Sequence, residues 1–226
     1  MLGAIVRGQG AYLATRLRHL TGRVPAGARE LAFADFTPPD SALARLSEEA
    51  ADEQSPAVRG HGYRTWAFGG ALAVLDGAHP DPEQFYVAAL LHDYGCDTIT
   101  AGEDFVLRSA ARAAQCAADA GLEALGPAIG DAICVHPTAG ITIEKDGAEG
   151  FYVQAGASFD LAGLRCGDLP RTFADQVHAA HPRASATSAF IDIVNREAAA
   201  QPGGRFAQLR RCGFTALMRL NPVDPD

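Results

Sequence analysis

The residues best suited to chemistry in this chain are two histidines and two aspartates: His61, the adjacent pair His92-Asp93, and Asp160. Each lies in a stretch that otherwise has the apolar pattern of a buried helix. Burying an imidazole or a carboxylate is costly unless another group pairs with it. One divalent cation would pair with all four side chains at once, and such mixed nitrogen and oxygen ligands suit Zn, Fe or Mn. We therefore expect these four residues to bind one divalent metal ion, with zinc favoured and iron or manganese as alternatives.

The surrounding pattern supports a buried position for each of the four. His61 and Asp160 recur with apolar residues at three- and four-residue steps, which places both on the inward faces of helices. Residues 85–91 are apolar on every side, as in a central buried helix, and this helix ends near His92. Structural alternatives stay open: a core hydrogen bond for His61, a helix-end position for His92, and a salt bridge from Asp160 to Arg165 or Arg171.

Apolar periodicity, caps and breaks predict an all-α fold of eight or nine helices. Ser41 and Asp81 are suited to cap the first turns of two helices, and Gly121 is suited to end another. Residues 137–149 are rich in turn formers and contain a short β-like segment at 141–143. We predict helices over residues 41–54, 56–76, 83–93, 104–120, 125–135, 151–164, 173–180, 186–200 and 204–219.

The composition limits the environment and the partners of the chain. It has 226 residues, a net charge of −8 and a single lysine, so it lacks the basic stripe that nucleic acid binding requires. No apolar run approaches the ~20 residues of a membrane-spanning helix. The five cysteines are widely spaced without a CxxC pair, which favours a cytoplasmic protein over a disulfide framework. We expect a leader segment at residues 1–40 and one domain at 41–226, whose last helices either cap the bundle or form a homodimer contact.

The order His61, His92-Asp93, Asp160 resembles the HD superfamily of metal-dependent hydrolases. Residues 88–95, with the sequence AALLHDYG, closely resemble the central motif of that family. The resemblance covers about residues 45–175 and implies an HD-domain helical bundle, with the His-Asp pair at the end of a buried helix. It also implies that the chain is a metal-dependent hydrolase or hydro-lyase.

Three further segments are similar to the cyanamide hydratase-like branch of the family. They are residues 61–65 (HGYRT), 133–138 (ICVHPT) and 155–160 (AGASFD). The branch usually has a serine where this chain has Gly62, and a glutamate where this chain has Val106. The resemblance therefore indicates the branch without implying its nitrile-hydrating activity.

The resemblance implies that the metal acidifies a water molecule and polarises a small-molecule substrate, so that water adds to phosphorus or to an unsaturated carbon. His136 is the expected proton shuttle or a hydrogen-bond donor behind the metal ligands. Arg64 lies one helical turn after His61, and we expect it to hold a substrate anion or to form a salt bridge with Asp93 or Asp160. Further expected substrate contacts, each with a packing or structural alternative, are Tyr63, Trp66, Tyr94, Arg108 and Arg171.

Three functions stay open at this point. A metal-dependent hydrolase or hydratase of a small molecule predicts a mostly apolar pocket with few basic groups. A nucleotide or phosphomonoester phosphohydrolase needs several cations around the phosphate. A non-catalytic metal- or ligand-binding HD protein would keep the four residues as a polar cluster. An oxygenase is a more distant option, since related two-metal sites use more histidines than the single His136 between residues 94 and 159.

Overall fold

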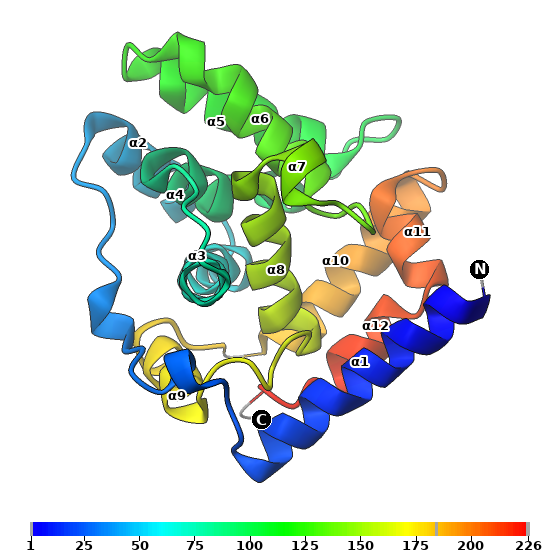
Figure 1. Ribbon diagram of the computed structural model, residues 1–226. Coiled ribbons are helices and arrows are strands. Elements are labelled where there is room, and N and C mark those ends of the chain that lie inside the picture. Colours follow the sequence, from blue (N-terminus) through cyan, green and yellow to red (C-terminus); the bar gives the residue numbers. More distant parts are fainter. Residues whose placement is uncertain (1, 184, 225–226) are drawn as a thin grey trace.

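The computed structural model describes residues 2–183 and 185–224, with side chains from residue 12 onward. Residue 1 and residues 225–226, at the outer ends of the predicted leader and domain, lie outside this part. The all-α fold is confirmed, with twelve α-helices and no strand in the described ranges (Figure 1). The α-helices are α1 Leu2–Thr21, α2 Ala42–Asp52, α3 Pro56–Asp76, α4 Pro82–Leu91, α5 Phe105–Asp119, α6 Gly126–Val135, α7 Ile143–Asp146, α8 Ala148–Ala162, α9 Arg171–Ala180, α10 Ala186–Ala200, α11 Arg205–Arg211 and α12 Phe214–Arg219.

The helices exceed the predicted eight or nine for three reasons. The predicted leader contains α1, a 20-residue helix. The predicted β-like segment at 141–143 is wrong, because residues 141–142 are irregular and Ile143 begins the one-turn helix α7. The predicted helix 204–219 is divided into α11 and α12 at Gly213, whose φ of 85° lies in the left-handed region that interrupts a helix.

Local capping signals set the first turns of α2 and α4. The hydroxyl of Ser41 accepts a hydrogen bond from the backbone N–H of Ala44 at 3.0 Å and so begins α2 as predicted. The carboxylate of Asp81 accepts from the N–H groups of Glu83 and Gln84, which begins α4. All residues from 85 to 91 are buried, so α4 is the central helix that its uniform apolar sequence predicted.

Two glycines allow α3 and α8 to pack backbone against backbone. A Cβ atom at Gly156 of α8 would overlap the carbonyl oxygen of Thr65, and one at Gly69 of α3 would overlap that of Tyr152. Figure 1 shows α3 at the centre of the bundle, with α4 and α8 beside it. This close approach of α3 and α8 brings the face of α3 that carries a histidine against the face of α8 that carries an aspartate.

The two ends of the chain cover one side of this bundle. The ring nitrogens of His19, near the end of α1, lie 3.1 Å from the carbonyl oxygens of Cys166 and Pro222. Helices α11 and α12 pack against α10 and α8 (Figure 1). These contacts place the last helices against the bundle, and the homodimer contact stays a prediction. No helix in the described ranges is both long and apolar enough to cross a membrane.

Candidate metal centre and its cavity

Four buried side chains converge where α3, α4 and α6 meet. His61 comes from the first half of α3, His92 and Asp93 directly follow α4, and His136 directly follows α6. None of the four is more than 6% exposed. The Nε2 atoms of His61 and His92 lie 3.6 and 3.4 Å from Oδ2 of Asp93. Nε2 of His136 lies 3.6 Å from the other oxygen, Oδ1, so three imidazoles surround one carboxylate.

The hydrogen bonds of the opposite ring nitrogens define which nitrogen carries the proton. Nδ1 of His92 lies 2.8 Å from the carbonyl of Ala89, and Nδ1 of His136 lies 2.6 Å from the carbonyl of Ile133. A carbonyl oxygen only accepts, so each Nδ1 donates, and each Nε2 of the neutral ring keeps a lone pair. Nδ1 of His61 likewise donates to a carboxylate, as described below. In its neutral form, each of the three rings therefore turns its Nε2 lone pair toward Asp93.

The polar atoms at the centre of this cluster lack hydrogen bonds. Within the described part of the chain, Nε2 of His61, Nε2 of His92 and Oδ1 of Asp93 are buried without a hydrogen-bond partner. Buried polar atoms without a partner are rare and require an explanation. His61, His92 and Asp93 each place one ligand atom within 4.8 Å of the others, so together they fit a divalent cation.

Asp160 takes a different position from the one we predicted. Its Oδ2 atom lies 2.7 Å from Nδ1 of His61, on the far side of the ring from Asp93. Its Oδ1 atom accepts hydrogen bonds from Nε of Arg64 at 2.9 Å and from Nη1 of Arg183 at 2.6 Å. Asp160 is thus the hydrogen-bond partner of one expected ligand, outside the group of three that lies close enough to share a cation.

The carboxylate of Asp160 is held by segments that are distant in the sequence. Arg64, fully buried, also donates to the carbonyls of residues 181 and 182. Arg183 donates to Asp224 at 3.2 Å, and the side-chain amide of Asn221 donates to the backbone carbonyl of Asp160 at 2.7 Å. Of the two roles that we left open for Arg64, the structure shows the salt bridge to Asp160. We did not predict Arg183, Asn221 or Asp224, because no local pattern distinguishes a loop arginine that reaches the core.

Burial and charge adjust the protonation of the cluster. Burial lowers the pKa of His61 to about 4, and burial also lowers the pKa of His136. Burial alone would raise the pKa of Asp93, but the neighbouring His92 and His136 outweigh it and hold that pKa well below its usual range. Burial also opposes protonation of His92, but the Asp93 carboxylate raises its pKa. At neutral pH, the cluster therefore offers an ionised carboxylate and two neutral imidazoles, the forms that bind metals.

Burial alone would likewise raise the pKa of Asp160. The positive charges of Arg64 and Arg183 outweigh it, so the pKa of Asp160 lies well below its usual range. Asp160 is consequently ionised at neutral pH and can only accept the proton of His61 Nδ1. A carboxylate behind a metal-binding histidine fixes its tautomer and strengthens it as a ligand.

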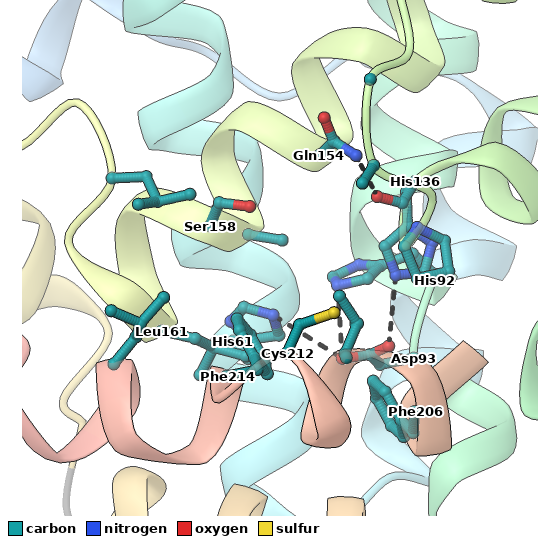
Figure 2. A pocket seen from close by; sticks show the side chains of 17 residues that line it. His61, His92, Asp93, His136, Gln154, Ser158, Leu161, Phe206, Cys212 and Phe214 are labelled. Atoms are coloured by element: carbon teal, nitrogen blue, oxygen red, sulfur yellow. Dashed lines mark hydrogen bonds and ion pairs between the residues drawn. The ribbon is translucent and has the colours of Figure 1, made fainter. Parts of the chain in front are cut away.

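A cavity of about 350 Å³ lies directly beside the cluster (Figure 2). It is bounded by α8, by the loop after α6, and by α11 and α12. His61, His92, Asp93 and His136 form its polar end. Most of the remaining wall is apolar and includes Leu161, Leu164, Phe206, Leu209, Phe214 and Leu217. Four of these six side chains come from α11 and α12, to which the sequence analysis gave no part in the site.

The three aromatic residues expected to contact a substrate lie elsewhere, and none lines this cavity. The ring of Tyr63 stacks on His181 with centroids 4.8 Å apart. Trp66 is buried in the core. The hydroxyl of Tyr94 donates to Glu53 at 2.5 Å. These placements match the packing roles that we kept as alternatives.

The arginines expected to hold a substrate anion are also absent from the cavity wall. Arg108 forms an ion pair with Glu197 at 3.1 Å. Arg171 donates to the carbonyl of His19 at 3.1 Å and borders a separate hollow between α1 and α9. Since Arg64 is committed to Asp160, no arginine or lysine of the described residues lines the cavity.

Comparison with models of known protein families finds no match to this chain, and comparison with curated proteins finds none either.

Proposed function

We propose that this protein is a metal-dependent enzyme of the HD type that adds activated water to a small molecule, as a hydrolase or a hydro-lyase. The observation that carries the proposal is the group of His61, His92 and Asp93, whose inward-facing atoms are buried beside a cavity without hydrogen-bond partners in the described part of the chain. Three protein ligands with further positions open is the pattern of catalytic rather than structural metal sites.

His61, His92 and Asp93 would hold the cation, and the rest of the cluster would orient them. A bound divalent cation would acidify a water molecule and polarise the substrate. Asp160 keeps the Nδ1 proton on His61, and the carbonyl of Ala89 does the same for His92. With Nδ1 carrying the proton, the Nε2 atom of each ring is the one that faces the cation position.

His136 is suited to move a proton during the reaction. Its Nε2 lies 3.6 Å from Asp93 and borders the cavity, but His136 is outside the close group of three. Burial lowers its pKa, so the ring is neutral at pH 7 and can accept a proton at Nε2. The Nδ1 hydrogen bond to Ile133 fixes the ring in the orientation that this transfer needs.

The cavity wall favours this function over phosphate-ester hydrolysis. A phosphate group is usually bound by several arginines or lysines. The described residues place no such cation on the wall, and both arginines near the cluster are paired with Asp160. The apolar surface instead suits a substrate that carries little charge.

The first test measures the metal content of protein purified without chelator, by plasma mass spectrometry. We expect about one equivalent of Zn, Fe or Mn in the wild type and its loss in His92→Ala. His79→Ala is the matched control, because His79 is exposed in the loop before α4. No metal in the wild type, even after reconstitution, would overturn the proposal and leave the cluster as a binding or structural feature.

The second test separates the role of His136 from that of the ligands. The metal-loaded protein is screened for hydration or hydrolysis of nitriles, amides and esters. His136→Gln is expected to keep the metal and lose most turnover. If this variant loses the metal instead, His136 is a ligand, and its assignment to proton transfer is wrong.

A further inference from the structure

We propose that the substrate of this site is an uncharged molecule with one polar, hydratable group and an apolar body. This substrate assignment rests on the proposed function. The polar group would face the His-Asp cluster, and the apolar body would lie against the leucines and phenylalanines contributed by α8, α11 and α12. Three features of the cavity carry this inference: its size, its charge and the placement of one serine hydroxyl.

The size of the cavity limits the substrate to a small molecule. At about 30 Å³ for each water-sized group, a volume of about 350 Å³ holds roughly a dozen non-hydrogen atoms. This value lies near the lower end of the usual range for ligand pockets. A nucleotide, with about 20 or more non-hydrogen atoms, would therefore exceed the cavity, whereas a chain of five to eight carbons with a polar head would fit.

The charge of the cavity disfavours ionic substrates. No arginine or lysine of the described residues lines the wall, so a charged group on the body of the substrate would find no opposite charge there. A charged body would also lose its hydration against Leu161, Leu209 and Phe214 without gaining a partner. An apolar body gains free energy from the same contacts, because its burial removes apolar surface from water.

One neutral polar group is placed to recognise the head of such a substrate. Ser158 lies on α8 between the cluster and the apolar wall, and Figure 2 shows its hydroxyl directed toward the cavity and the histidines. In the described part of the chain, this hydroxyl has no hydrogen-bond partner. It can donate to a carbonyl oxygen or to a nitrile nitrogen, both of which are uncharged acceptors.

The test uses alkyl hydroxamic acids, which are uncharged in neutral solution and share one metal-binding head. Their binding to the metal-loaded protein is measured by titration calorimetry from the two-carbon to the six-carbon chain. We expect affinity to rise about fourfold per added methylene, the factor that corresponds to burial of one CH₂ group. Six-carbon hydroxamic acids with a terminal carboxylate or ammonium group should bind no better than the two-carbon compound.

Variants of the wall show whether the apolar body occupies this cavity. Phe214→Ala should reduce the gain per methylene while the two-carbon compound binds as before. Leu107→Ala is the matched control, since Leu107 lies on α5 with 51% exposure and outside the cavity, and it should change neither value. A wild-type affinity that is independent of chain length, or equally tight binding of the chains with charged ends, would overturn the inference.

The same experiment distinguishes failure of this inference from failure of the proposed function. If the purified protein binds no metal, and no hydroxamic acid binds after reconstitution, the proposed function fails and the inference fails with it. If the metal is present and the two-carbon compound binds in a metal-dependent manner without any chain-length effect, the metal site stands and only the substrate class is wrong.

Discussion

Replacing Asp160 by asparagine tests whether this residue supports the metal ligand His61 or binds the metal itself. The substitution keeps the shape of the side chain but removes its charge. Arg64 and Arg183, at 0% and 3% exposure, would then lack the carboxylate that each contacts within 3 Å. His61 would face an amide that can either accept or donate a hydrogen bond, so its Nδ1 tautomer would no longer be fixed.

Two magnitudes follow from this geometry. Removing one partner of a buried ion pair costs about 3–5 kcal/mol of stability, because the remaining charges are left buried. Loss of a hydrogen-bond partner behind a metal ligand weakens metal binding by about 10–100-fold. Removing a direct ligand, as in His92→Ala, is expected to abolish binding at micromolar metal. Asp160→Asn should therefore fold less stably but still bind metal.

Urea unfolding in the presence of chelator gives the stability, and competition against a chromogenic chelator gives the metal affinity. Asp52→Asn is the matched control, because Asp52 forms an exposed ion pair with Arg59 at 3.0 Å. Surface pairs of this kind contribute about 0–1 kcal/mol, so the control should behave as the wild type. Complete loss of metal from a folded Asp160→Asn protein would refute the reasoning and restore Asp160 as a direct ligand.

Three further predictions concern packing, pH and the serine of the cavity. Gly156→Ala should lower the free energy of unfolding by about 1–3 kcal/mol, because its methyl group would overlap the carbonyl of Thr65. Gly203→Ala is the control and should leave this free energy unchanged, because there is open space around Gly203. Equal effects of the two substitutions would contradict the close packing of α3 and α8. The folded pKa of His61, about 4, lies below its ordinary value of 6.5, so the metal-free protein loses about 3 kcal/mol of stability as pH falls from 6.5 toward 4. Paired urea titrations at pH 7 and 4.5 should show that His61→Gln lacks this loss. The same pH dependence of stability in the variant and the wild type would contradict the prediction. Ser158→Ala should weaken hydroxamate binding severalfold at every chain length without altering metal content, and unchanged binding would exclude this hydroxyl from recognition of the head group.

Helix caps and apolar periodicity are local features of the sequence, and they predicted the positions of most helices. The boundaries of α3 were predicted to the residue, and the caps at Ser41 and Asp81 were confirmed. Such signals depend on neighbours within one helical turn, so a single sequence is enough to find them. The convergence of His61 with His92-Asp93 could also be predicted, since each lies on a helix face that has to be buried.

The sequence could not specify which side chains from distant segments contact one another across the bundle. Helical spacing placed Asp160 on an inward face, but it could not distinguish a position beside the metal from one behind His61. Arg183 occupies a loop whose local sequence resembles any exposed turn, and it reaches the core only because the chain returns past α8. The apolar wall from α11 and α12 is likewise a result of tertiary packing, since amphipathic helices of this kind can pack in many places.

The buried ion pairs around Asp160 also explain why the two arginines near the cluster do not line the cavity. Two carboxylates, of Asp160 and Asp224, accept from two guanidinium groups, of Arg64 and Arg183, so the four charges balance. The balanced network lies behind His61, where it fixes the ring, and neither arginine lines the cavity. Electrostatic support for the metal ligand is thereby separated from the surface that contacts the substrate. Because neither arginine reaches the cavity wall, these two cations cannot serve as phosphate-binding groups of the site.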